Sequence, residues 1–261
     1  GAPADSDPPP ELDYDMWLGP APRRAYNRNR ALYHFRWFWD YSGGQMTNLG
    51  SHELDVVHWA MQVTGPLAVS SSGGRFALQD NGETPDTQDA LFEYPAFTAL
   101  WSHREASEGR GADEGLEFFG TRGSLRISRR GFEVFPDLKT APEDHIPQFR
   151  GHPAGGPPRR AESRPELWTE ALKEQASNDL LPSHARKFLD CIKSRQRPVA
   201  DVEDGHRTAT ACHLANISLK VGSKIRWDAA KEEIIGDPEA SAHLVRPYRK
   251  PWDEIVEGLK L

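Results

Sequence analysis

The feature that most constrains this chain is a series of short β-forming runs between residues 67 and 135, separated by turn sequences. The turns include Gly73-Gly74 and Gly82 after Asp-Asn, which are residue types that end strands. The connections are short, whereas a parallel connection needs a crossover of about a dozen residues or more, so the runs predict antiparallel pairing. The expected strands are 67–70, 75–78, 89–94, 98–103, 115–119, 124–127 and 132–135.

Helical patterns flank these runs on both sides. Apolar residues recur at helical spacing over 47–62, and Gly65-Pro66 ends that segment. Two more helices are expected at 183–194 and 201–221, the second beginning with acidic residues and ending before Gly222. Together the patterns predict an α+β fold, a predominantly antiparallel β-sheet with helices packed on one face.

Proline marks two irregular segments. Of 21 prolines, six lie in residues 1–22 and eight in 136–182. The first group predicts an extended Pro-rich N-terminal arm over 1–30, and the second predicts a long Pro-rich excursion with a short helix around 166–176. The expected organisation is therefore the arm followed by a single α+β domain over 31–261.

Charge and composition exclude several classes of function. The net charge is −7 and Lys and Arg are scattered among Asp and Glu, so no basic stripe offers itself to nucleic acid. No stretch approaches 18 uninterrupted apolar residues, so no membrane span is expected. Cys191 and Cys212 lack the spacing of a disulfide framework or a metal site, and the histidines are not spaced as metal ligands, so no metal is expected. The N-terminal residues show no signal-peptide pattern, which favours a cytoplasmic protein; removal of an upstream signal would leave a periplasmic one open.

One polar stripe on the first predicted helix could carry chemistry. Asn48, His52, Asp55 and Trp59 are spaced by four, three and four residues, so all four fall on one face of a helix. A histidine one turn from a carboxylate can be held in one tautomer and poised for proton transfer. The alternative is that His52 is hydrogen-bonded structurally, with Asp55 as its partner.

An aromatic run precedes this helix. Residues 33–41 hold six aromatic rings besides His34, with Arg36 and Trp37 among them. Such a run predicts either a sugar-stacking platform, with the arginine binding hydroxyls or carboxylates, or a buried core or interface.

The usual signatures of nucleotide and hydrolase sites are missing from the sequence. We find no GxGxxG, P-loop, HExxH or GxSxG pattern. From its own residues, the chain is therefore expected to bind no cofactor.

Several segments, taken in order, resemble one branch of the Gfo/Idh/MocA oxidoreductases. They are Leu12 to Pro22, the Arg36-Trp-Phe-Trp-Asp-Tyr segment, Gly43-Gly-Gln-Met-Thr-Asn48-Leu-Gly-Ser-His52-Glu-Leu-Asp55, Glu83-Thr-Pro-Asp-Thr, Phe188-Leu-Asp-Cys-Ile-Lys-Ser-Arg, Gly205-His-Arg, Leu214-Ala-Asn-Ile-Ser and Arg246-Pro-Tyr-Arg. The resemblance extends over almost the whole chain but involves only the C-terminal half of the family's two-domain plan. Family members begin with a Rossmann domain that binds NAD(P), followed by a Glu-Lys-Pro segment, and neither is present here. The resemblance implies NAD(P) only if a Rossmann domain is supplied upstream.

The resemblance also implies a partner and a site. The partner would be a sugar or polyol derivative, and one face of the sheet would form a homodimer or larger homo-oligomer. The family's Asp-x-x-x-His pattern falls on Asn48 and His52, so His52 takes the acid/base position, while Asn48 cannot ionise but can hydrogen-bond a hydroxyl. We therefore predict His52 and Asn48 as catalytic residues. The predicted substrate-binding residues are Arg36, Trp37, Asp55 and His103.

Three hypotheses follow for the function. The chain is the sugar- or polyol-binding domain of an NAD(P)-dependent oxidoreductase without its nucleotide-binding domain. Alternatively, it is a cofactor-independent lyase, epimerase or hydrolase that uses His52, or it is a non-catalytic carbohydrate-binding or oligomerisation module.

Overall fold

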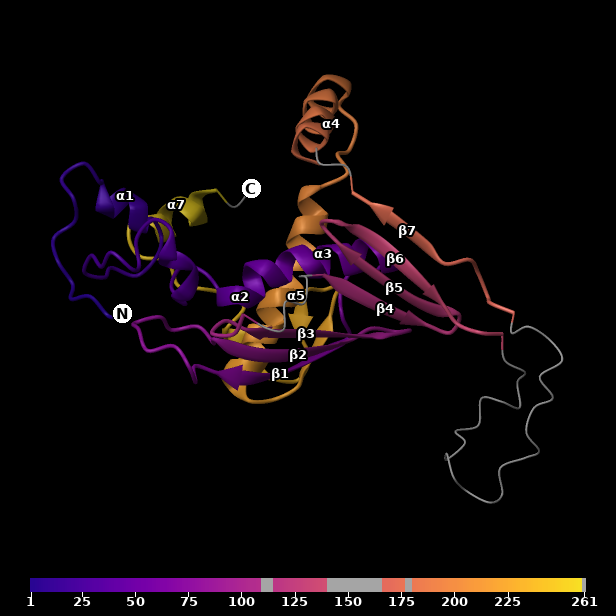
Figure 1. Cartoon of the computed structure of the whole chain (residues 1–261). Helices are drawn as coiled ribbons and strands as arrows, with labels where there is room; N and C mark the ends of the chain where they lie inside the picture. Colours follow the sequence, from indigo (N-terminus) through magenta and orange to yellow (C-terminus); the bar gives the residue numbers. More distant parts are fainter. Residues whose placement is uncertain (109–114, 140–165, 177–179, 260–261) are drawn as a thin grey trace, which may run out of the picture. The chain divides into compact units, whose positions relative to one another are not determined.

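The computed structural model describes residues 1–108, 115–139, 166–176 and 180–259. Its contacts divide the chain into two compact units, Gly1–Arg110 with Arg197–Leu261, and Gly111–Gln196. Each unit contains one antiparallel sheet, and the helices lie mainly in the first (Figure 1). The predicted α+β class is confirmed. The division into a 1–30 arm and a 31–261 domain stays a prediction.

The first unit is built on a five-stranded sheet of order β3-β2-β1-β8-β9. The strands are β1 (Ala68–Gly74), β2 (Thr87–Glu93), β3 (Thr98–Arg104), β8 (Ile225–Asp228) and β9 (Glu233–Ile234). Val69 of β1 pairs with Phe92 of β2 on one side and Ile225 of β8 on the other, and all three are fully buried. The strand expected at 75–78 is wrong. The backbone N–H groups of residues 76–78 donate to the Asp86 carboxylate and so cannot donate to a neighbouring strand.

Helices pack against this sheet and complete its core. The long helix α5 (Val202–Val221) contacts β1, and it also contacts α2 (Gly44–Thr47) and α3 (Leu49–Met61). As predicted, α5 begins after a capping Asp201 and ends at Gly222 in the left-handed conformation. The helix expected over 47–62 is interrupted at Asn48, which separates α2 from α3. Shorter helices are α1 (Tyr14–Leu18), the 3-10 helix η1 (His34–Trp37), α6 (Pro238–Ala242) and α7 (Trp252–Gly258).

The N-terminal segment is fixed by aromatic stacking and by the C-terminal residues. Tyr14 stacks on Trp17 at 5.7 Å between ring centres, and Trp17 meets Tyr41 edge-on at 5.1 Å. Arg249 donates to the Asp15 carbonyl at 2.8 Å and forms an ion pair with its carboxylate at 3.1 Å. Aromatic docking, the condition under which a Pro-rich arm can be ordered, is therefore met.

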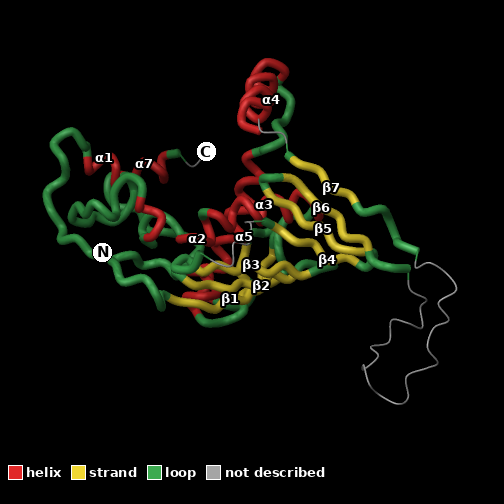
Figure 2. Tube along the Cα trace, in the orientation of Figure 1, coloured by secondary structure: helices red, strands yellow, loops and turns green. Residues whose placement is uncertain are grey.

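The second unit holds a four-stranded antiparallel sheet of order β4-β5-β6-β7. The strands are β4 (Leu116–Gly120), β5 (Gly123–Ser128), β6 (Gly131–Pro136) and β7 (Leu172–Gln175), and α4 (Leu180–Ser194) follows (Figure 2). The short helix expected around 166–176 is wrong, because β7 pairs there with β6. The rest of the predicted excursion, 140–165 and 177–179, lies outside the described residues. The strand runs on either side of 109–114 therefore form two sheets rather than one.

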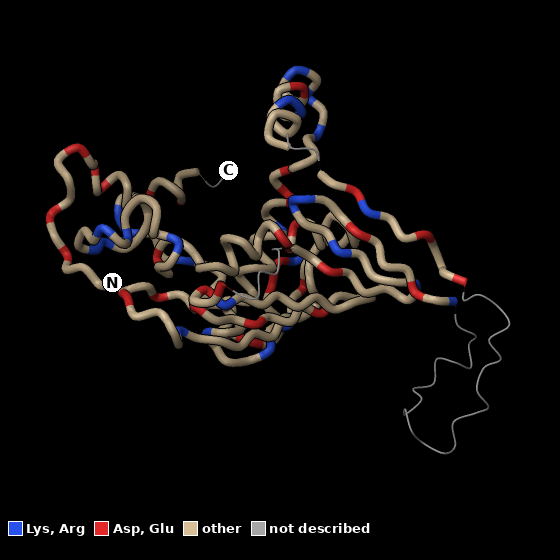
Figure 3. Tube along the Cα trace, in the orientation of Figure 1, with Lys and Arg blue, Asp and Glu red and all other residues tan. Residues whose placement is uncertain are grey.

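The register gives the second sheet two different faces. Across the four strands, Phe118, Leu125, Val134 and Leu172 are aligned partners on one face. The next row, on the opposite face, is Glu117, Arg126, Glu133 and Lys173, with the Lys173 ammonium 2.9 Å from Glu133. The first row is thus apolar and the second carries alternating charges, and the exposed Phe119 and Phe135 lie on the same face as the charged row. Figure 3 shows the same interspersion of signs along both units.

Within the described part of the chain, no helix is both long and apolar enough to cross a membrane.

Candidate functional site

Asn48 lies at the break between α2 and α3, and its side chain does not cap α3 as an asparagine at this position usually does. It is the N-cap residue of α3, with φ −89° and ψ −86°, but its side chain accepts no hydrogen bond from the first turn of the helix. A capping side chain typically stabilises a helix by about 1 kcal/mol. Here Asn48 Oδ1 accepts from Arg36 Nε at 3.3 Å, and Nδ2 donates to Gln45 Oε1 at 3.1 Å. The amide is therefore held by two other side chains in a fixed orientation.

Arg36 is held by aromatic rings rather than by an acid. Its guanidinium carbon lies 4.5 Å from the Tyr33 ring centre and 5.1 Å from that of Phe35, and Nη1 donates to the Tyr33 carbonyl at 2.5 Å. Among the described residues, no carboxylate lies within salt-bridge distance of this guanidinium. Cation–π contacts of this kind favour an arginine whose plane is partly withdrawn from water.

Trp37 takes part in the site through its backbone. Its carbonyl accepts hydrogen bonds from the backbone N–H groups of Glu83 at 2.7 Å and Thr84 at 3.3 Å. These two bonds fix the aromatic segment to the loop that precedes β2. Trp37 thereby positions its neighbour Arg36, and its use in substrate stacking stays a prediction.

The turn before α2 is fixed by a glycine and a buried polar network. Gly44 has φ +69°, and a Cβ there would lie 2.7 Å from the side chain of Thr84, so only glycine fits without a shift. The Gly43 carbonyl accepts from Asn216 Nδ2 of α5 at 2.9 Å. Asn216 Oδ1 in turn accepts from the buried Gln88 of β2 at 3.3 Å. The start of α2 is thus tied to both the long helix and the sheet.

His52 lies one turn after Asn48 on α3 and is exposed, and its imidazole makes no hydrogen bond to another described residue. Asp55 does not orient it. The Asp55 carboxylate instead accepts from Thr208 Oγ1 at 3.4 Å, which joins α3 to α5. His52 and Asp55 therefore lie on α3 with Asn48 at its N-cap, but the side chains of Asn48 and Asp55 have different partners. The assignment of His52 as acid/base, and of Asp55 to substrate binding, stays a prediction.

His103 lies on β3, as predicted, with both ring nitrogens engaged inside the protein. Nδ1 accepts from the Trp101 indole N–H at 3.1 Å, so Nε2 carries the proton and donates to the Pro85 carbonyl at 3.3 Å. Burial lowers the pKa of His103, which favours this neutral ring. Trp101 packs under α3 at Gly50. The geometry makes His103 a positioning residue for the sheet beneath α3, and its predicted contact with substrate is untested.

Sequence reasoning missed Gln45, Thr84 and Asn216. Gln45 could have been found, because it precedes Asn48 by three residues, a spacing that brings side chains together on a helix. Thr84 and Asn216 are distant in sequence from the turn they fix, so no local pattern identifies them.

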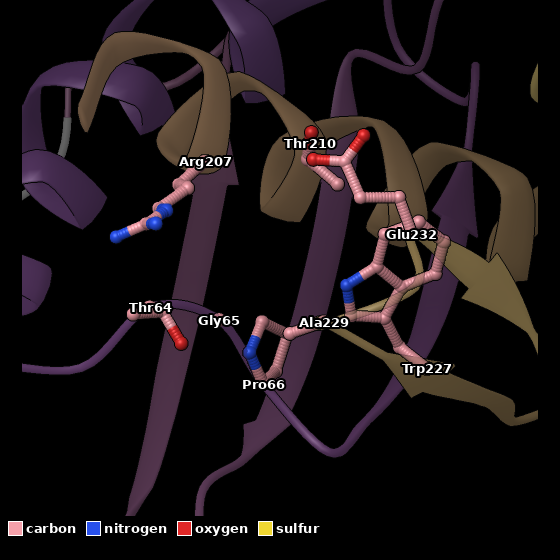
Figure 4. A pocket seen from close by; sticks show the side chains of 8 residues that line it. All are labelled: Thr64, Gly65, Pro66, Arg207, Thr210, Trp227, Ala229 and Glu232. Atoms are coloured by element: carbon pink, nitrogen blue, oxygen red, sulfur yellow. The ribbon is translucent and has the colours of Figure 1, made fainter. Parts of the chain in front are cut away.

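A separate pocket in the first unit holds none of the predicted site residues (Figure 4). Its charged groups already have partners: Arg207 pairs with Glu203 at 2.9 Å, and Glu232 with His206 at 2.7 Å. The lining residues are Thr64, Gly65, Pro66, Arg207, Thr210, Trp227, Ala229 and Glu232. Because both of its charged side chains already have partners, this pocket is a weaker candidate than the residues around Arg36.

No group of three or more His, Cys, Asp and Glu residues is placed to hold a metal ion in the described ranges. The described residues also do not form the usual arrangement of a dinucleotide site. Each strand pair among them is antiparallel, whereas a dinucleotide site is built from parallel strands with a glycine-rich turn into a helix.

Comparison with known proteins identifies the family. The model of the Gfo/Idh/MocA oxidoreductase family, C-terminal alpha/beta domain, matches residues 4–73 and 169–254, more than half of the chain. The chain therefore belongs to this oxidoreductase family. A search of curated proteins found no match.

Solved structures of similar fold carry oxidoreductase names. Levoglucosan dehydrogenase, in complex with NADH and levoglucosan, superposes with a TM-score of 0.52 at 14% identity, covering 73% of this chain and 52% of that one. The WlbA dehydrogenase from Bordetella pertussis, in complex with NADH and UDP-GlcNAcA, gives 0.48 at 15% identity, covering 74% and 48%. An oxidoreductase from Agrobacterium radiobacter, in complex with NAD+, L-tartaric acid and magnesium, gives 0.49 at 15% identity, covering 70% and 49%. The chain spans about half the length of these structures, and at such identities the likeness concerns the fold.

Proposed function

We propose that this chain is the sugar- or polyol-binding part of a Gfo/Idh/MocA oxidoreductase, with the nicotinamide nucleotide bound outside the described residues. The observation that carries the proposal is the side chain of Asn48, which leaves its capping position and is held between Arg36 and Gln45. Three polar side chains thereby converge at the start of α3. We call Arg36, Gln45, Asn48 and His52 the α3 site.

Each member of the α3 site has a role that its chemistry allows. Arg36 and the two amides donate hydrogen bonds to substrate oxygens. His52, exposed and one turn further along α3, takes or returns the proton of the reacting hydroxyl. Asn48 cannot exchange a proton at neutral pH, so it positions the hydroxyl. The exposed Tyr33 ring offers an apolar face for the C–H side of a sugar.

The test is sugar and polyol binding by the full chain, measured by calorimetry. Arg36→Gln should weaken binding about tenfold or more, the usual consequence of removing a charge-assisted hydrogen bond. His52→Gln should leave binding nearly unchanged, because a proton-transfer group acts in the reaction. Arg226→Gln, at an exposed arginine of β8, is the matched control.

Two outcomes would contradict the proposal. One is equal binding by Arg36→Gln and the wild type. The other is turnover of a sugar by the purified chain without any nucleotide, lost in His52→Gln, which would indicate cofactor-independent proton chemistry instead.

We also propose that the chain forms a homodimer or larger homo-oligomer through the apolar face of the β4–β7 sheet. The alignment of Phe118, Leu125, Val134 and Leu172 supports this, because apolar rows of this kind occur at subunit interfaces. Light scattering of the wild type should give a mass above the 29.3 kDa of one chain. Leu125→Lys should lower that mass, while Glu117→Lys, in the charged row of the opposite face, should not. A wild-type monomer at micromolar concentration would contradict this proposal.

A further inference from the structure

We propose that the ligand of the α3 site carries a carboxylate, so that the substrate class is a sugar acid rather than a neutral sugar or polyol. The inference rests on the proposed function, since it concerns the same site, and it is argued from the charge and the hydrogen-bonding capacity of the residues there.

The charge of Arg36 is not compensated within the described residues. The groups that contact its guanidinium are all neutral: the Asn48 amide oxygen, the Tyr33 carbonyl, and the Tyr33 and Phe35 rings. Its side chain is only partly exposed. A partly desolvated cation is stabilised most by an anion that reaches it, and no carboxylate in the described part of the chain reaches Arg36.

Other arginines of the first unit show the contrast. Arg24 lies 2.6 Å from the Asp40 carboxylate, and Arg104 lies 2.8 Å from that of Asp89. In these two places the arginine is paired with an acid of the same chain, whereas Arg246 donates to the Asp40 and Ser42 carbonyls at 3.2 and 3.3 Å and, like Arg36, has no carboxylate partner among the described residues. Arg36 is held in place just as firmly, by rings and by neutral acceptors, and its charge stays available.

Most of the free hydrogen-bonding capacity around Arg36 is donor capacity. A guanidinium has five N–H groups, of which Arg36 uses one on Asn48 and one on the Tyr33 carbonyl, which leaves three. Asn48 Nδ2 has one N–H left after its bond to Gln45 Oε1, and that same bond occupies a lone pair of Gln45 and leaves its NH₂ group. An ionised carboxylate accepts hydrogen bonds and donates none, and it can meet an arginine with two parallel bonds. A neutral hydroxyl could use the remaining lone pairs of Asn48 Oδ1 and Gln45 Oε1, but it carries no charge to meet that of Arg36 and cannot form two parallel bonds with it.

The uncharged side chain of Asn48 leaves the α3 site with the positive charge of Arg36. Its oxygen lies 3.3 Å from Arg36 Nε as an uncharged amide. An aspartate at this position would place a negative charge at the same distance, pair with the guanidinium, and repel a second carboxylate. The substitution Asn48→Asp therefore changes the charge of the site and very little of its shape.

The experiment compares matched ligands by calorimetry on the full chain, using D-glucuronate against D-glucose and D-galacturonate against D-galactose. Each pair differs only in a carboxylate at the terminal carbon. The wild type should bind the acids at least about tenfold more tightly, a difference of about 1.4 kcal/mol. Both Arg36→Gln and Asn48→Asp should abolish that preference. His52→Gln should retain it, which separates Arg36 from His52 as the source of positive charge, and far-UV circular dichroism should show each variant folded.

Different failures have different meanings. If acids and neutral sugars bind the wild type equally, or if Arg36→Gln keeps the preference for acids, the inference is wrong and the proposed function stands. If no ligand of either pair binds, the proposed function itself is contradicted, and the inference with it.

Discussion

The fully buried carboxylate of Asp86 should stabilise the loop that supports the α3 site, and Asp86→Asn should reveal by how much. Asp86 Oδ2 accepts backbone N–H groups from Phe76, Ala77 and Leu78 at 3.1, 2.8 and 2.7 Å. The residues just before it, 84 and 85, contact Gly44 and accept from His103. One carboxylate thus fixes a segment on which the turn before α2 depends.

The pKa of Asp86 gives the magnitude. Burial alone would raise it, but hydrogen bonds from the N–H groups of Leu78, Phe76 and Ala77 lower it from 3.8 to about 2. The difference is nearly two, and at about 1.4 kcal/mol for each pKa unit it corresponds to about 2 kcal/mol of stability at neutral pH. Because the folded pKa lies below the unfolded one, this contribution is complete above about pH 4 and is lost as the pH falls toward 2.

Urea unfolding followed by circular dichroism tests this reasoning. At pH 7, Asp86→Asn should lower the free energy of unfolding by about 2 kcal/mol. Asp89→Asn, the same change at an exposed carboxylate paired with Arg104, should lower it by less than about 1 kcal/mol. The difference in free energy of unfolding between the wild type and Asp86→Asn should become smaller as the pH falls from 4 to 2. Equal effects of the two variants, or a gap that does not change with pH, would refute the argument.

Two further predictions concern single residues of the first unit. Gly44→Ala should lower the free energy of unfolding by more than Gly222→Ala, for which a loss of about 1 kcal/mol is expected. Both glycines have positive φ, but only at Gly44 would a Cβ meet a neighbour, Thr84. Equal losses of stability in the two variants would contradict this. Burial raises the pKa of Glu105 to about 7, so the stability linked to its neutral form is present below about pH 4.5 and lost as the pH rises through 7. Glu105→Gln should therefore be more stable than the wild type at pH 8, by roughly 1–2 kcal/mol, and equally stable at pH 4; a variant less stable at pH 8 would contradict it.

The sequence predicts a helix or strand well where the residues of that element alone mark its ends. The helix at α5 has both ends marked, by Asp201 and Gly222, and the structure places them there. Strand pairing is different, because alternation along a strand does not say which strand lies beside it. The series of runs from 67 to 135 therefore reads as one sheet although it forms parts of two, and β8 joins β1 from a distance of about 150 residues.

The failures at 75–78 and 166–176 have separate physical causes. At 75–78, a side chain from ten residues away accepts the N–H groups that a strand would use, so a β-forming composition becomes a loop. At 172–175, all four residues are exposed, and the strand exists through its pairing with β6. Neither a side-chain acceptor nor a tertiary partner leaves a signal in the local sequence.

The α3 site depends both on helical spacing, which the local sequence shows, and on a contact that the local sequence does not show. Helical spacing correctly relates His52 and Asp55 along α3, but it also places Asn48 inside a continuous helix, where its amide would belong to the same stripe. In the structure the helix begins after Asn48, and that break lets the amide turn toward Arg36, twelve residues earlier. Spacing therefore identifies which residues are near one another, while the backbone break determines the partner of Asn48. Since no carboxylate of the described residues pairs with that partner, the break underlies the proposed preference for a sugar acid.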